Sequence, residues 1–187
     1  MPNWCSNGIT LRHADPAMID RAQKSDGLLM EFLPTPQDLI DTVAGFKGED
    51  EREAHEAQQR ANIEKYGYKD WYDWNVANWG TKWDFTLENV DRPDPNTLTA
   101  AFDSAWSPPV EAYRRLEELG FEIEAMYYEP GMAFCGSYTT EFGEDTYEIG
   151  GETADTVRDA IGAELDDYFG ISESMAEWEA ENAEENG

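Results

Sequence analysis

The chain has few basic residues, and it has almost none in its last third. Its 187 residues include 41 Asp and Glu against 13 Lys and Arg, which gives a net charge of −28. Residues 116–187 hold 21 acidic residues and a single base, Arg158, whereas residues 1–115 hold 20 acidic and 12 basic residues. Such a chain repels nucleic acid, because protein partners of nucleic acid neutralise phosphates with Lys and Arg. A charge this uneven indicates instead a protein partner with a basic groove.

Cysteine, histidine and long apolar runs are also scarce. Cys5 and Cys135 are the only cysteines and lie far apart, so we expect reduced thiols. Together with His13 and His55 they do not give the short ligand spacing of a zinc site. No apolar run approaches the ~18 residues of a membrane span, and the N-terminus lacks the basic and apolar regions of a signal peptide. We therefore expect no metal, no cofactor and no membrane partner.

The sequence contains no catalytic motif that we recognise. Walker, Rossmann, HExxH and EF-hand patterns are all missing. Cys5 and His13 could in principle form a nucleophile and its base, but no third group stands near them, which favours a packed thiol. The many carboxylates guarantee chance pairs, so a carboxylate pair is not informative. We expect the protein not to be an enzyme; an enzyme of unfamiliar type would need a deep pocket with perturbed carboxylates.

The composition nevertheless predicts a folded domain, since 40% of the residues are hydrophobic and 13% are aromatic. Alternating apolar residues predict strands at about 3–12, 98–104 and 121–127, followed by a meander within 132–149. Pro108 and Pro109 are typical of a helix start, and Gly120 of its end. The order of elements predicts an α+β fold with a ferredoxin-like antiparallel sheet and helices on one face.

Further local patterns refine this prediction. Residues 28–33 read as a short strand, and residues 81–89 as a strand with Trp83, Phe85 and Leu87 on one face. Residues 48–65 are polar and helix-prone, which indicates an exposed helix. Asp70 can cap a short Trp-rich helix that stops at Gly80. We therefore expect residues from about 35 to 80 to form a helical Trp-rich insertion in a ferredoxin-like domain of residues 1–150.

Five short motifs, in this order, resemble the YubB-like family of phage and plasmid proteins. They are Asn3-Trp4-Cys5-Ser6-Asn7, Trp71-Tyr72-Asp73-Trp74, Asn78-Trp79-Gly80-Thr81-Lys82-Trp83, Ala105-Trp106-Ser107-Pro108-Pro109 and Tyr128-Glu129-Pro130-Gly131 with Phe134 and Gly136. The resemblance covers about residues 2–140 and implies a ferredoxin-like domain carried by a mobile element. It implies no activity and no catalytic residue.

Six tryptophans lie within or near these motifs, and they allow two interpretations. They are Trp4, Trp71, Trp74, Trp79, Trp83 and Trp106. They could form a stacking platform for bases or a packed aromatic core. The net charge favours the core, because few lysines lie nearby to attract phosphates. Asn3, Asn7, Asn78 and Thr81 would then hold backbone groups or indole N–H groups in place.

Residues 151–187 predict an acidic helical extension packed on this domain. Thr153 begins a helix whose Val157, Ile161, Leu165 and Tyr168 point inward. In the last segment Ile171, Met175 and Trp178 form an apolar stripe, with Trp178 anchoring the helix and glutamates on its outer side. The candidate partner-binding residues are Asp155, Asp159, Glu164, Asp166, Asp167, Glu173, Glu177, Glu181, Glu184 and Glu185.

These observations predict a phage or plasmid inhibitor of host defence that acts in the host cytoplasm. It would bind a host nucleic-acid-binding protein, such as a restriction enzyme or a CRISPR effector, as an acidic DNA mimic, without binding nucleic acid itself. The alternative is an accessory protein of a mobile element that binds another protein through its aromatic face. Two simpler interpretations stay open, a solvated acidic surface without a partner and adaptation to a salty cytoplasm.

Overall fold

An antiparallel sheet forms the centre of the fold. The computed structural model covers residues 3–185, with side chains through residue 183, and in this range the strand order is β2-β3-β1-β4-β5-β6. The strands are β1 (Trp4–His13), β2 (Glu88–Asp94), β3 (Thr97–Ala105), β4 (Phe121–Glu129), β5 (Phe134–Thr139) and β6 (Gly143–Glu148). All neighbouring strands are antiparallel. With the helices described below, the protein has the predicted α+β architecture.

Side-chain alternation explains why these segments are strands. In β4, Phe121, Ile123 and Tyr127 are buried, whereas Glu122 and Glu124 point to the opposite face and are exposed. Successive side chains of a strand point to opposite faces, so this pattern suits a sheet with an apolar core on one side. The strands predicted at about 3–12, 98–104 and 121–127 are confirmed.

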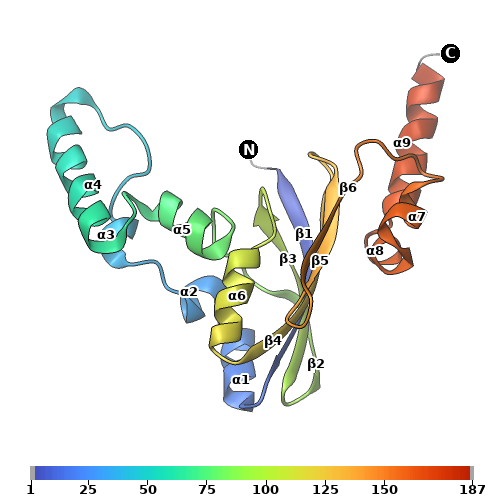
Figure 1. Ribbon diagram of the computed structural model, residues 1–187, viewed down its shortest axis with the longest axis horizontal. Coiled ribbons are helices and arrows are strands. Elements are labelled where there is room, and N and C mark those ends of the chain that lie inside the picture. The colour runs from blue at the N-terminus through green and yellow to red at the C-terminus, as the bar shows by residue number, and fades with distance from the viewer. Residues whose placement is uncertain (1–2, 186–187) are drawn as a thin grey trace.

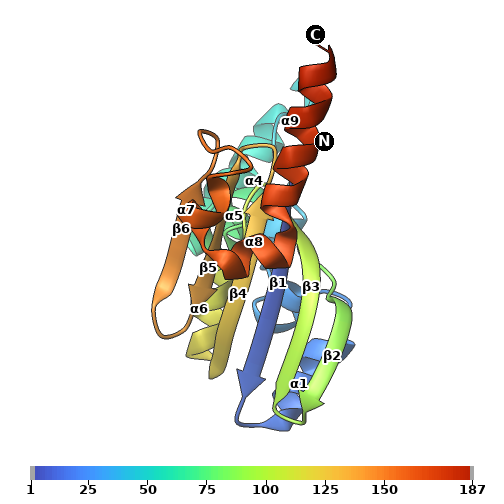
Figure 2. The same cartoon turned by 90° about the vertical axis from the view of Figure 1, so that its right-hand side faces the viewer.

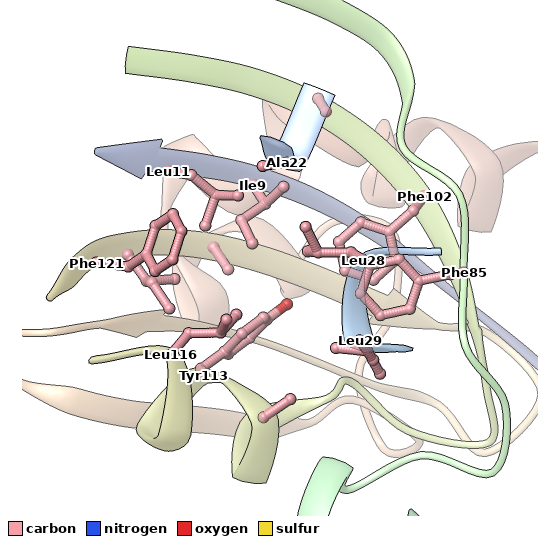
Figure 3. Close-up of a cluster of buried hydrophobic side chains, with 14 of the residues drawn as sticks. Ile9, Leu11, Ala22, Leu28, Leu29, Phe85, Phe102, Tyr113, Leu116 and Phe121 are labelled. Atoms are coloured by element: carbon pink, nitrogen blue, oxygen red, sulfur yellow. The ribbon is translucent and has the colours of Figure 1, made fainter. Parts of the chain in front are cut away.

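Three helices cover the first face of the sheet, which is the face that carries Leu11 (Figure 1). They are α1 (Pro16–Lys24), α2 (Leu28–Phe32) and α6 (Val110–Glu118). Figure 3 shows Leu11 in one cluster with Tyr113 and Leu116 of α6. In the same cluster the rings of Phe85 and Phe102 stack with their centroids 3.7 Å apart. This cluster is the main core, and the body of the protein is built around it.

A helical insertion between α2 and β2 projects away from the sheet (Figure 1). It contains α3 (Gln37–Ile40), the 3-10 helix η1 (Glu49–Glu51), α4 (Arg52–Tyr66) and α5 (Trp71–Trp79). As predicted, α4 is largely exposed; its buried Asn62 donates hydrogen bonds to Thr42 Oγ1 and the Lys69 carbonyl, both at 2.9 Å. Asp70 caps α5 with its side chain, and Gly80 ends the helix with a φ of 81°, again as predicted.

The C-terminal helices lie on the second face of the sheet (Figures 1 and 2). They are α7 (Val157–Ile161), α8 (Ala163–Phe169) and α9 (Ile171–Glu185). A second buried cluster joins them to the sheet and consists of Cys135, Ile149, Val157, Ile161, Leu165 and Ile171. The sequence predicted helices on one face, and the structure has them on both. The reason is that the second face also carries apolar side chains that need cover, Met126 and Tyr128 among them.

Two predicted strands and one predicted helix are wrong. Residues 28–32 form α2, because the Asp84 carboxylate accepts hydrogen bonds from the N–H groups of Leu29 and Met30 at the start of that helix. Residues 81–87 form no strand, and β2 begins only at Glu88. The helix predicted from Thr153 is instead the separate helices α7 and α8, divided at Gly162 with a φ of 87°.

Candidate partner-binding surfaces

A row of exposed glutamates runs along α9. Glu173, Glu177 and Glu181 are exposed and follow one another at four-residue spacing. Residues at this spacing share one side of a helix and rise about 6 Å per step. We call these three residues the glutamate row. The helix therefore sets the backbone positions from which these three side chains project.

Ile171 attaches α9 to the body, and Trp178 does not. Ile171 is buried in the second cluster, and Met175 packs against that cluster. Trp178 is 65% exposed, so the prediction that it anchors the helix is wrong. The second half of α9 extends beyond the other C-terminal helices (Figure 1). In this half Glu179 contacts the segment before α7, because its Oε1 accepts a hydrogen bond from the Ala154 N–H at 3.0 Å.

Asp166 is a structural carboxylate and not a surface charge. It is only 2% exposed, and it accepts hydrogen bonds from the Ser172 backbone N–H at 2.7 Å and the Ser172 hydroxyl at 2.8 Å. Burial by itself raises the pKa of Asp166, but the hydrogen bonds from Ser172 and Arg158 together hold that pKa below its ordinary value. Asp166 thus satisfies a backbone N–H in the first turn of α9 and leaves little surface for a partner.

Arg158, the one base among residues 116–187, is already paired. Its guanidinium donates to Asp166 Oδ2 at 2.7 Å and to both carboxylate oxygens of Asp167, at 2.5 and 3.1 Å. These hydrogen bonds raise the pKa of Arg158 and lower the pKa of Asp167. The charge of Asp167 is therefore partly neutralised, although its side chain stays exposed.

The remaining predicted residues divide into three groups. Asp155 and Asp159 are exposed near α7, and Glu164 is exposed at the start of α8. The glutamate row lies on α9. Glu184 and Glu185 belong to the last turn of α9, but their side chains lie outside the described residues. Their part in the surface stays a prediction.

The six tryptophans do not form the predicted aromatic core. Trp79 is buried and donates its indole N–H to the Leu33 carbonyl at 3.0 Å. Trp4, Trp83 and Trp106, in contrast, are 49%, 39% and 44% exposed. The rings of Trp4 and Trp83 lie 6.1 Å apart, centroid to centroid. We call Trp4, Trp83 and Trp106 the aromatic end, and they present apolar surface to solvent.

Hydrogen bonds hold the motif segments together at this end. The Trp106 N–H donates to the Asn3 carbonyl at 3.0 Å, and the Ser107 hydroxyl donates to the Gly80 carbonyl at 2.6 Å. Thr81 Oγ1 donates to the Ala105 carbonyl at 3.0 Å, which confirms the prediction that Thr81 holds a backbone group in place. Trp106 has a φ of 73°, which a bulky residue adopts only when its surroundings impose it. The sequence motifs thus meet in space around exposed rings.

One lysine is held against these rings. Lys82 Nζ lies 4.5 Å from the ring centroid of Trp83 and 5.6 Å from that of Tyr72. Within the described part of the chain Lys82 has no carboxylate at ion-pairing distance. The aromatic end therefore differs in charge from the acidic C-terminal helices.

The structure supports the interpretation of Cys5 as a packed thiol. Cys5 and Cys135 are buried, and burial raises the pKa of Cys5 to about 12 and that of Cys135 to about 11. Cys5 lies near one end of β1 and His13 at the other, about 26 Å apart at the rise of an extended strand. Among residues 3–185 no group of three His, Cys, Asp or Glu is placed to hold a metal ion. In the same range no helix is long and apolar enough to cross a membrane.

Comparison with known proteins adds little to this geometry. No family model matches the chain, and no curated protein matches it. A crystal structure of protein api92 from Yersinia pseudotuberculosis, of the DUF1281 family, is similar over 80% of this chain and 99% of that chain. The two sequences are 14% identical and the TM-score is 0.41. A likeness this weak carries no argument about what the chain binds.

Proposed function

We propose that the protein is a phage or plasmid inhibitor of host defence that occupies the basic groove of a nucleic-acid-binding protein. The partner would be a restriction enzyme or a CRISPR effector in the host cytoplasm, and the acidic C-terminal helices would take the place of DNA. The observation that supports the proposal is the glutamate row, exposed on a helix whose Ile171 is buried against the body.

The spacing and sign of these charges suit such a partner. Phosphates of one DNA strand rise about 3.4 Å per step, and the glutamates of α9 rise about 6 Å per step, so both present a regular line of negative charge. Like charges four residues apart cost about 0.2–0.5 kcal/mol per pair in an isolated helix. The repulsion within α9 is tolerated here, and a cationic groove would relieve it and accelerate association.

We also propose that the body belongs to the YubB-like family and has a ferredoxin-like core. The order β2-β3-β1-β4, with α1 between β1 and β2 and α6 between β3 and β4, supports this arrangement. In this view β5 and β6 extend the sheet, residues 1–150 are the domain, and residues 151–187 are its acidic extension.

A charge-reversal experiment tests the inhibitor proposal. In the test variant, Glu173, Glu177 and Glu181 are all changed to Lys. A matched control reverses Glu49, Glu53 and Glu64, which are exposed in η1 and α4. Each variant is used to capture proteins from host lysate at low and high salt, followed by mass spectrometry. We expect the wild type and the control to enrich nucleic-acid-binding proteins at low salt only, and the α9 variant to lose them. Equal capture by both variants would contradict the proposal.

The aromatic end supports a second candidate function, a protein-binding accessory role in a mobile element. Trp4, Trp83 and Trp106 are exposed although they could bury much apolar area, and exposed aromatic clusters are typical of interfaces. In this case changing Trp4 and Trp83 to Ala would abolish capture of the partner, and salt would scarcely affect binding. Capture that survives this change and is lost in salt would favour the inhibitor instead.

A further inference from the structure

A groove of about 810 Å³ lies between the second face of the sheet and the segment that joins α7 to α8. Its floor is a row of four residues on neighbouring strands. Ala101 of β3 pairs with Gly8 of β1, Gly8 pairs with Met126 of β4, and Met126 pairs with Ser137 of β5. Ala101, Gly8 and Ser137 have small side chains, and Met126 is the one large side chain of this row. In Figure 2 the C-terminal helices lie over only part of this face.

Two carboxylates line the groove, and one of them already binds a guanidinium. Arg12 donates to Glu124 Oε1 at 2.8 Å and to Oε2 at 3.3 Å, in the two-pronged geometry that Arg and carboxylates prefer. Glu164, on the opposite wall, has no hydrogen bond or ion pair within the described part of the chain. No lysine or arginine is among the groove's lining residues.

Apolar groups complete the walls. Met126 and Leu165 line the groove, and so do Tyr147 and Tyr168. The Tyr168 hydroxyl lies directly over Gly8, since a Cβ added there would be 2.1 Å from that oxygen. The groove therefore offers apolar surface for an aliphatic stem, two tyrosine side chains in its lining, and a carboxylate that has no partner in the described part of the chain.

We propose that this groove binds an arginine side chain from an extended basic segment of the partner protein. The stem of arginine can bury against apolar walls while its planar head reaches a carboxylate and stacks on an aromatic ring. The pairing of Arg12 with Glu124 shows this chemistry at the same face. The inference rests on the proposed function in one respect, which is that the partner is basic.

A steric variant separates the groove from general charge attraction. Ala101→Trp fills the floor without changing the net charge, and β-strands accept tryptophan well. The control is Ala54→Trp, at an exposed position of α4. Binding of a fluorescein-labelled tetra-arginine peptide is measured by anisotropy, and circular dichroism confirms that each variant is folded. We expect Ala101→Trp to weaken binding at least about tenfold and the control to change it less than about twofold.

A charge variant provides the second arm. Glu164→Gln and Glu53→Gln each remove one exposed carboxylate, and only Glu164 lines the groove. Losing a charge-assisted hydrogen bond should weaken tetra-arginine binding about tenfold for Glu164→Gln. Unchanged affinity of Ala101→Trp, or equal weakening by the two Gln variants, would overturn the groove proposal.

The same variants keep this inference distinct from the proposed function. If Ala101→Trp binds tetra-arginine normally while charge reversal on α9 abolishes protein capture, the groove fails and the inhibitor proposal stands. If α9 reversal leaves capture intact while Ala101→Trp abolishes peptide binding, the DNA-mimic mechanism fails and the groove stands.

Discussion

At the scale of single residues, burial decides which charged side chains are exposed to solvent. Asp166 is almost fully buried and fully hydrogen-bonded, and the adjacent Asp167 is exposed and shares Arg158 with it. The sequence shows two neighbouring aspartates of the same kind. Their surroundings make the first a structural residue and the second a surface charge.

Replacing Asp166 should destabilise the C-terminal helices. Asp166→Asn leaves Arg158 with one carboxylate fewer and disturbs the hydrogen bonds of Ser172, which should cost about 1–3 kcal/mol in the free energy of unfolding. Asp167→Asn, at an exposed ion pair, should cost less than Asp166→Asn. Urea unfolding of both variants measures the difference, and equal losses would contradict the structural role of Asp166.

The effect of Asp166→Asn should also depend on pH. The pKa of Asp166 is lower in the folded state than its ordinary value of 3.8. Its stabilising contribution is therefore complete above that value and is lost as the pH falls through the lower folded pKa. Urea unfolding should show a large gap between wild type and variant at about pH 7 and a smaller gap at about pH 3. A gap that widens at low pH would contradict a folded-state pKa below 3.8 for Asp166.

The two thiols should be unreactive in the folded protein. Both are buried, and burial raises the pKa of Cys5 to about 12 and of Cys135 to about 11. Thiolate is the reactive form, so Ellman's reagent should label neither at about pH 8. Both should react after unfolding in guanidinium chloride. Rapid labelling of the native protein would mean that one of these strands opens readily.

At the scale of elements, α9 is attached through its first half. Ile171 is buried and Met175 is partly buried, whereas Trp178 is mostly exposed. A helix with this distribution holds its glutamates in place only as long as its first two turns stay packed. The position of the glutamate row therefore depends on residues that carry no charge.

Substitutions in the first half of α9 should therefore cost more stability than substitutions in its second half. Ile171→Ala should cost about 2–5 kcal/mol, because it leaves a cavity in the second cluster. Trp178→Ala should change stability by no more than about 0.5 kcal/mol, because its ring has little contact to lose. Thermal unfolding compares the variants, and hydrogen exchange of the α9 amides shows whether the helix loosens. A large loss in Trp178→Ala would mean that the ring packs in solution.

At the scale of the whole molecule, self-repulsion opposes folding. A net charge of −28 on 187 residues is large, and most of it lies in the last third of the chain. The C-terminal helices pack on the sheet through the second cluster, on the face opposite the main core. Packing across the sheet must therefore outweigh the repulsion among the acidic helices.

Moderate salt should stabilise the protein for this reason. Raising the ionic strength from about 0.01 M to about 0.15 M shortens the Debye length from about 30 Å to about 8 Å, which screens the repulsion. We expect Tm to rise by at least about 2–4 °C, the shift that corresponds to about 1 kcal/mol in a chain of this size. Changing Glu173, Glu177 and Glu181 to Gln should reduce this rise, and calorimetry measures both. A salt-independent Tm would show that the charges are too far apart to interact.

The sequence by itself determined the local elements and the distribution of charge. Alternation fixed β1, β3 and β4, the prolines and Gly120 bounded α6, and Asp70 and Gly80 bounded α5, because these signals act between residues near in the chain. Only the tertiary structure decided the rest. Asp84 made α2 a helix from a distance of 55 residues, and the second face of the sheet took the C-terminal helices. Packing also buried Asp166 and left Trp4 and Trp178 exposed, because the burial of a side chain depends on which distant segments of the chain pack against it.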